Sequence, residues 1–443
     1  MARQSPRRTL FARAACALGL GAVLLGACNK PSSDNIQLWK TTQKGPDRLR
    51  DALAEHTVEP RLRAEAAAAL VDIGQAEDVD GILAKMPIED RAELTKSLVP
   101  IYEVAMKSPG PTADHALNYR DALYSLRQYA PPDDQKQIDA VLLPVLEADL
   151  RAGSLRQGRH SLDKMLTAIG VDAGAMLARV LAEPGAPFPM AAELLGKVGD
   201  EPTRDKGAAA LLARAPSGKN DKTAKPAEKL ALLRSLGTIG GPTAVRYLET
   251  QAMGADKEEA ANAVRALQVR RDPAVLPFAL KVAGDAKADK VVRDEMFGVL
   301  ETIGGLDAQK GLLGIISSDR EEIVRYRAFE SVLAATKADG LIPGLEAFPA
   351  TAAYKKVDVD DLLVKLIEKL GPPARPELIK ALESRSPLAR MTAVMALEQM
   401  GHAPDATALQ KLSDDSTQLK GFPAGDTIGK EAVRVAEAVK KKA

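Results

Sequence analysis

The chain has 443 residues, of which 46% are hydrophobic, 27% are charged and only 3% are aromatic. This apolar content excludes an intrinsically disordered chain, and an interior so poor in aromatic residues favours packed helices over a β-sandwich. The formal net charge of +1 argues against a general nucleic-acid-binding protein.

The first 27 residues have the pattern of an export signal. Four arginines and no acidic residue precede residues 14–27, a segment of 14 uncharged and mostly apolar residues. Such a segment is too short to cross a hydrocarbon core of about 30 Å, but it has the length of the apolar region of a secretory signal peptide. We therefore expect residues 1–27 to be removed from the mature protein.

The expected signal closes on the residues LGAC, which end at Cys28 and resemble a bacterial lipobox. The resemblance implies that Cys28 is acylated and becomes the first residue of a lipoprotein. Several acyl chains would anchor it firmly, since one chain alone holds a protein only marginally. It also implies a place in the cell envelope, facing the periplasm, and Asn29 in the second mature position favours the outer membrane. An ordinary signal peptide that happens to hold Cys28 is the alternative, and Arg7-Arg8 leaves twin-arginine export open beside the general route.

The mature chain predicted in this way has little covalent chemistry available. Without the four arginines of the signal it has 57 basic and 60 acidic residues, a formal charge of −3. Its only cysteine would be the acylated Cys28, since Cys16 leaves with the signal, so no disulfide, thiol nucleophile or cysteine metal site is expected. Residues 28–46 are polar and contain two prolines, which predicts a flexible tether.

From residue 47 onward one pattern recurs. A starting residue, usually basic, is followed by apolar residues at offsets of 3, 7 and 10 and by a glycine at offset 11. These offsets place the apolar side chains on one stripe of a helix, which the glycine would end in a left-handed conformation. The clearest copies start at Arg63, Arg159, Arg293 and Arg390. Their offset-seven residues, predicted to be buried, are Leu70, Leu166, Leu300 and Leu397.

A second apolar-periodic helix follows most of these glycines, and successive copies after Phe188 start 30 to 41 residues apart. Residues 387–401 (PLARMTAVMALEQMG) and 322–336 (EIVRYRAFESVLAAT) resemble bacterial HEAT repeats. The resemblance implies an all-α fold, a right-handed α-solenoid of about ten helix pairs. It is clearest over residues 187–443, which end in a capping helix, whereas residues 47–186 are expected to form irregular helical repeats.

No motif points to catalysis. The four histidines have no metal-ligand spacing, and neither a phosphate-binding loop nor a nucleophile elbow is present. We therefore expect no enzyme activity, metal or cofactor. The recurring arginines allow two interpretations: a basic ladder that grips an anionic partner, or internal pairing with an acid or carbonyl of a neighbouring repeat. The second is the usual arrangement in HEAT-like proteins and is preferred.

The remaining function class is protein binding, and we expect a membrane-anchored scaffold of the cell envelope. A partner, weakly favoured to be acidic, would bind the inner face, which we expect the second helices to form. The candidate basic residues there are Arg246, Lys281, Lys310, Lys380 and Lys411, which could equally be solvated side chains. Tyr102, Tyr119 and Tyr124 are candidate interface anchors or, alternatively, core residues of amphipathic helices. The other functions considered are a spacer between membrane and cell wall, and a lyase-like HEAT protein that handles a tetrapyrrole.

Overall fold

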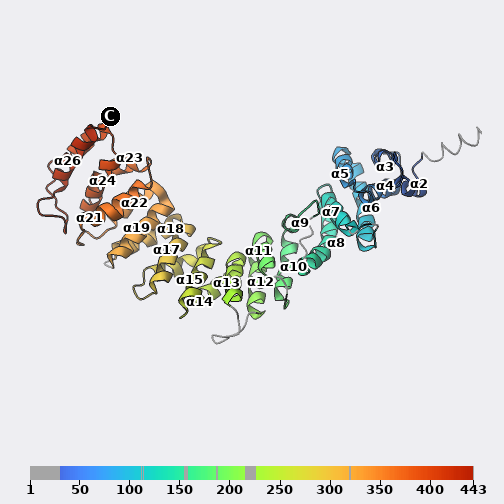
Figure 1. Ribbon diagram of the computed structural model, residues 1–443, viewed down its shortest axis with the longest axis horizontal. Helices are drawn as coiled ribbons and strands as arrows, with labels where there is room; N and C mark the ends of the chain where they lie inside the picture. Colours follow the sequence, from blue (N-terminus) through green and yellow to red (C-terminus); the bar gives the residue numbers. More distant parts are fainter. Residues whose placement is uncertain are drawn as a thin grey trace, which may run out of the picture. The chain divides into compact units, whose positions relative to one another are not determined.

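The computed structural model describes residues 30–110, 112, 114–153, 158–185, 188–214, 226–318 and 321–442. These residues are predominantly helical (Figure 1), and within them the only β-type pairing is an isolated antiparallel bridge between Gln418 and Thr427. The expected all-α class is confirmed. The predicted signal, with Cys16 and Cys28, lies outside the described residues.

The chain divides into two compact units, Met1–Thr203 and Arg204–Ala443. The division falls inside helix α12, somewhat after the boundary at residues 186 and 187 expected from the repeat pattern. The helices of the first unit are α2 (Ser33–Trp39), α3 (Gly45–Ala54), α4 (Pro60–Asp72), α5 (Ala76–Lys85), α6 (Ile88–Lys107), α7 (His115–Arg127), α8 (Pro132–Arg151), α9 (Leu162–Ile169), α10 (Val171–Ala182), α11 (Phe188–Val198) and the start of α12 (Glu201–Arg214).

The expected flexible tether at residues 28–46 is contradicted at Ser33–Trp39, which form helix α2. Ile36 and Trp39 are 0% and 2% exposed, and α2 packs against α3 and α4. The spacing of three residues places both side chains on one face of a helix, so two apolar residues are enough to dock a polar segment. The Ser32 hydroxyl accepts a hydrogen bond from the Asn35 backbone N–H at 3.3 Å and caps the helix.

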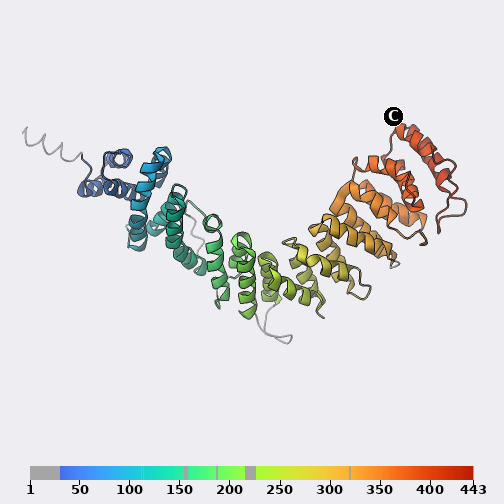
Figure 2. The ribbon, with the colours of Figure 1, turned by 180° about the vertical axis from the view of Figure 1, so that it is seen from behind.

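The second unit consists of helix pairs that follow one another along the chain (Figures 1 and 2). Its elements are the remainder of α12, then α13 (Pro226–Ile239), α14 (Pro242–Ala252), α15 (Lys257–Gln268), η1 (Pro273–Val275), α16 (Leu276–Ala283), α17 (Lys290–Ile303), α18 (Gly305–Ser317), α19 (Glu322–Thr336), η2 (Lys337–Gly340), α20 (Leu341–Glu346), α21 (Lys356–Asp358), η3 (Val359–Val364), α22 (Lys365–Glu368), α23 (Ala374–Ala381), α24 (Pro387–Met400), η4 (Ala403–Asp405), α25 (Ala406–Gln410) and α26 (Ile428–Lys440).

These helices form two layers. The helices that carry the repeated pattern, α13, α15, α17, α19, α21–η3–α22, α24 and α26, make the first-helix layer. The helices that follow them, α14, α16, α18, α20, α23 and α25, make the second-helix layer. Within each layer most neighbours pack side by side: α15, α17 and α19 in one, and α16, α18 and α20 in the other. Contacts therefore run mainly between elements close in the chain.

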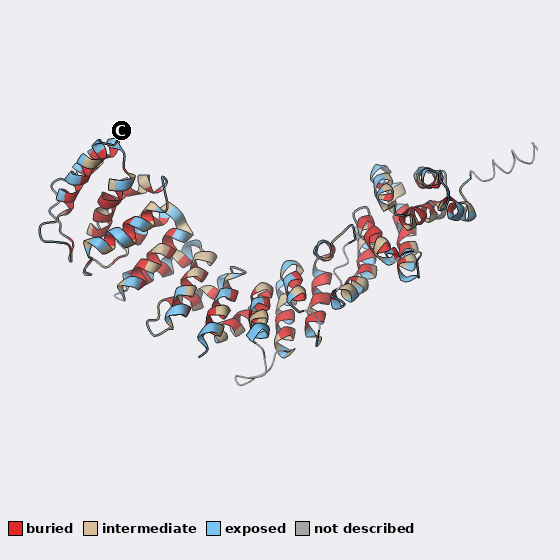
Figure 3. Cartoon of the chain, in the orientation of Figure 1, coloured by how far each residue is buried: buried red, intermediate tan, exposed pale blue. Residues whose placement is uncertain are grey.

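The predicted burial of the offset-seven leucines is confirmed. Leu70, Leu166, Leu300 and Leu397 are all 0% exposed. Figure 3 shows the corresponding pattern, in which most helices have a buried side and an exposed side. Burying a leucine side chain stabilises the fold by about 1.5–3 kcal/mol, so each of these leucines contributes to the packing between neighbouring helices.

Glycine was expected to end each copy of the pattern with a positive φ, and it does so in three of the four clearest copies. Gly74, Gly170 and Gly304 have φ values of 78°, 77° and 65°, a region that favours glycine. Gly401 differs, because its backbone is extended, with φ of −76° and ψ of 157°. A Cβ there would lie 2.5 Å from the Leu397 carbonyl oxygen and 2.7 Å from a methyl group of Val439. Glycine is needed at this position for close packing against α26.

Candidate functional site

The five basic residues proposed for partner binding all lie exposed on the second-helix layer. Arg246, Lys281, Lys310 and Lys380 belong to α14, α16, α18 and α23, and Lys411 directly follows α25. Two of them pair with an acid of their own helix: Lys380 Nζ lies 2.6 Å from Glu377, and Lys310 Nζ lies 3.8 Å from Asp307. The other three make no ion pair with a described residue, so their charges are available to a partner.

The tyrosines do not form an exposed patch. Tyr102 and Tyr119 are 1% and 2% exposed, and their rings meet edge to face with centroids 5.4 Å apart. The prediction that these two side chains anchor a partner is therefore wrong, and the alternative of core residues is correct, because α6 and α7 turn them inward against α4. Tyr124 is half-buried and its ring contacts that of His160, with centroids 4.8 Å apart.

The Asp72 carboxylate contacts three polar side chains, those of Tyr119, Lys40 and His115. Its Oδ1 accepts a hydrogen bond from the Tyr119 hydroxyl at 2.8 Å, and its Oδ2 lies 2.9 Å from Lys40 Nζ. Nδ1 of His115 lies 3.5 Å from the same carboxylate. Burial, and then the nearby Asp72 carboxylate, raises the pKa of Tyr119 above its usual value. The cluster connects the end of α2 with α4 and α7, so its role is to stabilise the packing of these helices.

Removing the two buried hydroxyl groups separately should give different results. Tyr119→Phe removes the hydrogen bond that the Tyr119 hydroxyl donates to Asp72 Oδ1, while the Lys40 contact at Oδ2 remains. The loss is expected to cost about 1–3 kcal/mol of unfolding free energy. Tyr102→Phe should be neutral or slightly stabilising, because the Tyr102 hydroxyl is buried with no partner among the described residues. Chemical denaturation of the two variants, followed by circular dichroism, measures the difference. Equal losses in both variants would contradict this description.

The four arginines that start the clearest copies are all paired internally, as the sequence favoured. Arg159 lies 2.8 Å from Asp80. Arg63 Nε donates to the Leu53 carbonyl oxygen at 3.0 Å, and Arg293 lies 3.3 Å from Glu321 at the start of the next pair. Arg390 lies 2.9 Å from Asp415. Arg63 and Arg293 are 5% and 7% exposed. These guanidinium groups fasten neighbouring helices and do not form an open basic ladder.

A serine and a histidine 35 positions apart come together in the first unit. Ser125 Oγ lies 3.0 Å from His160 Nε2. Nucleophilic catalysis would require an acid on the other ring nitrogen, but that Nδ1 has no described partner, while the nearby Asp121 carboxylate accepts a hydrogen bond from the His160 backbone N–H at 3.3 Å. Burial lowers the pKa of His160. The arrangement is not a catalytic triad.

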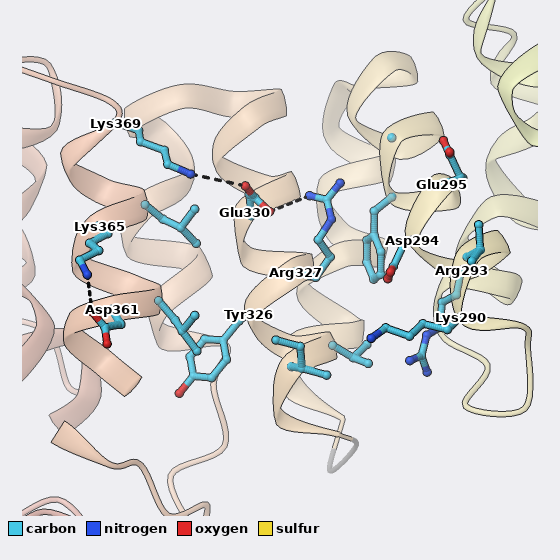
Figure 4. Close-up of a pocket in the computed structure, with 17 residues that line it drawn as sticks. Lys290, Arg293, Asp294, Glu295, Tyr326, Arg327, Glu330, Asp361, Lys365 and Lys369 are labelled. Atoms are coloured by element: carbon cyan, nitrogen blue, oxygen red, sulfur yellow. Dashed lines mark hydrogen bonds and ion pairs between the residues drawn. The ribbon is translucent and has the colours of Figure 1, made fainter. Parts of the chain in front are cut away.

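A hollow of about 760 Å³ lies on the first-helix layer, and sequence reasoning missed it (Figure 4). Its walls are α17 and η3–α22, with α19 between them. We call this hollow the α19 groove. Its apolar lining includes Val291 and Ile323, which are 49% and 56% exposed. The groove exists because α19 packs closely against α17 but only loosely against η3 and α22. That spacing has no signature in the helical periodicity.

The described ranges offer little else that could carry chemistry. They contain no group of three or more His, Cys, Asp and Glu side chains that could hold a metal ion. In the same ranges no single helix is long and apolar enough to cross a membrane. The bent pair α9 and α10, with 119° between the helices, reaches that length and composition together.

Comparisons with known proteins give a weak likeness to a solved structure. No protein-family model matches the chain, and no curated protein does. Among solved structures it is similar to human deoxyhypusine hydroxylase in complex with glycerol. The TM-score is 0.18 at 15% sequence identity, over 79% of this chain and 97% of that chain. A TM-score this low carries no argument about fold or function.

Proposed function

We propose that this protein is a lipid-anchored scaffold of the bacterial cell envelope, built as a HEAT-like solenoid, that binds a partner protein. The observation that carries the proposal is the basic row, the five exposed basic residues at the second helices α14, α16, α18, α23 and α25. Three of them make no ion pair with a described residue. Layers of helices packed in chain order support a continuous surface of this kind. A row of cations on such a surface favours an acidic partner and speeds its encounter.

The anchor is tested separately at Cys28. Metabolic labelling with a fatty-acid analogue should label the wild-type protein and not a Cys28→Ser variant. Mass analysis of the labelled protein should then find an acylated Cys28 at the amino terminus. Intact Met1, or an unmodified thiol at Cys28, would contradict the anchor. Membrane fractionation alone does not decide, because an uncleaved apolar segment would also hold the variant to a membrane.

The partner-binding surface is tested by charge reversal. A variant with Arg246, Lys281, Lys310, Lys380 and Lys411 all changed to Glu should lose its chemical crosslinks to the partner in intact cells. In isolated membranes the wild-type crosslinks should weaken as salt rises, because surface ion pairs are screened at distances beyond about 10 Å in 0.1 M salt. The matched control reverses five exposed lysines of the first unit, at Lys44, Lys85, Lys96, Lys136 and Lys164.

The outcomes separate the alternatives. If the control loses the crosslinks as well, the effect is one of net charge and the basic row is not the binding surface. If the five-residue variant keeps its crosslinks, the basic row has no part in binding. An absence of protein crosslinks in the wild type would favour a spacer between membrane and cell wall. A visible absorption band in the purified protein would favour tetrapyrrole handling.

A further inference from the structure

The α19 groove presents apolar surface that the described residues leave uncovered. Val291 and Ile323 each occupy the second position of a first-layer helix, and both are about half exposed. Leu362 and Leu366 line the opposite wall and are partly exposed, while the rings of Phe297 and Tyr326 lie buried between the walls. Large apolar side chains gathered in one hollow are typical of a surface that a partner covers.

Most charged side chains around the groove are already paired. Arg327 lies 2.6 Å from Glu301 and 3.0 Å from Glu330, and its guanidinium stacks 5.5 Å from the Phe297 ring centroid. Lys365 pairs with Asp361, as the dashed line in Figure 4 shows. The other paired groups are Lys369 with Glu330, Glu295 with Arg265 and Arg293 with Glu321.

Two charged side chains of the groove make no ion pair with a described residue. These are Lys290 and Asp294, which lie one turn apart on α17 and are both exposed. Figure 4 shows the Lys290 side chain extending from α17 toward the groove. The wall therefore offers one free cation and one free anion beside the apolar lining.

The wall opposite α17 contains a π-helical turn, η3, within the continuous helix from Lys356 to Glu368. Its residues Asp361 and Leu362 line the groove. A π turn inserts an extra residue into the helix and is found frequently at functional sites. The π turn therefore lies in the wall against which α19 packs only loosely.

We propose that the α19 groove binds a short peptide segment of a partner protein, which carries two or three large apolar side chains together with one acidic and one basic residue. The apolar side chains fill the space over Ile323 and Val291, the acid pairs with Lys290 and the base pairs with Asp294. This inference rests on the proposed scaffold function and deepens it, because it names the class of sequence that the scaffold recognises. Apolar anchors give such contacts most of their affinity, and complementary charges fix their register.

The test is a selection from a phage-displayed library of random peptides of about 12 residues. A peptide of this length can present several apolar anchor residues to a groove. The target is the full chain purified in detergent. The wild type should enrich sequences with large apolar residues and both an acid and a base. Lys290→Glu should shift the enriched flanking residues to two bases, and Asp294→Lys should shift them to two acids.

Two further variants locate the site. Ile323→Asp places a charge in the middle of the apolar lining and should weaken the enriched peptides at least about tenfold, measured by fluorescence anisotropy, which corresponds to 1.4 kcal/mol. Leu306→Asp is the matched control, because Leu306 is an exposed leucine, 73% accessible, on α18 in the second-helix layer. This control should bind as the wild type does. Both positions are at the surface, so neither variant should unfold the chain.

Three results would overturn the inference: a library that yields no peptide sensitive to Ile323→Asp, a consensus that the two charge variants leave unmoved, or self-association. In the last case sedimentation would show a dimer that Ile323→Asp disrupts, and the occupant would be a second copy of this chain. Failure here leaves the scaffold proposal standing, because the basic row tested by charge reversal lies on the other layer.

Discussion

Leu300→Ala is expected to loosen the helices around α17 while distant parts of the chain stay protected. Leu300 is 0% exposed on α17, which packs against α15, α16 and α19. Replacing a buried leucine by alanine removes apolar contacts and leaves a cavity, at a cost of about 2–5 kcal/mol. Because contacts run mainly between neighbouring elements, this cost should fall on the local helices first.

Hydrogen exchange resolved by segment measures this expectation. Amide protection should fall in α15 to α19 and remain unchanged in α3, α4, α24 and α26. Val291→Ala is the control on the same helix, because Val291 is 49% exposed and its truncation should change protection little. A uniform loss of protection along the whole chain, or no change near residue 300, would show that the helices do not stack as semi-independent neighbours.

Arg120→Met is expected to destabilise the first unit by about 3–5 kcal/mol, the cost of leaving a buried charge without its partner. The Arg120 side chain is 3% exposed and lies 2.9 Å from Asp121 and 2.8 Å from Asp149. The Asp121 side chain is itself only 2% exposed. Without the guanidinium, that carboxylate remains in the interior, and among the described residues it keeps only the hydrogen bond from the His160 backbone N–H at 3.3 Å.

Arg151→Met provides the matched comparison in the neighbouring helix. Arg151 is 44% exposed and lies 2.7 Å from Glu147. Exposed ion pairs contribute about 0–1 kcal/mol, so this variant should unfold at nearly the wild-type denaturant concentration. Adding Asp121→Asn to Arg120→Met should restore part of the lost stability, because it removes the unpaired charge. Similar losses in the two single variants, or no restoration, would contradict a buried pair at Arg120.

Features set by periodicity within one helix could be predicted from the sequence. The apolar stripe with Leu70 and Leu300 needs only the 3.6-residue repeat, and the glycine stops at Gly74 and Gly304 need only the backbone freedom of glycine. The docking of α2 was missed because its polar composition concealed Ile36 and Trp39, whose spacing places them on one face. The inward direction of Tyr102 and Tyr119 depends on how α6 and α7 face α4, which composition does not specify.

Features that depend on distant residues could not be predicted in this way. Ser125 meets His160 across 35 positions, and Tyr119 meets Asp72 across 47 positions. The α19 groove depends on the loose packing between α19 and η3–α22 and on a π-helical turn, and neither changes the hydrophobic pattern. The exposed basic row could be predicted from the sequence, because its residues occur at similar distances after the glycine that ends each first helix.

Binding of a partner protein by the second unit can be tested in intact cells by site-specific photocrosslinking. A photoreactive amino acid is placed at Lys310 on the second-helix layer, at Ile323 in the α19 groove, and at the exposed Lys96 of the first unit as the control. Partner binding by the second unit predicts a discrete protein adduct from Lys310, from Ile323 or from both, and none from Lys96. With all three variants expressed at wild-type levels, the absence of an adduct from both positions of the second unit would contradict it.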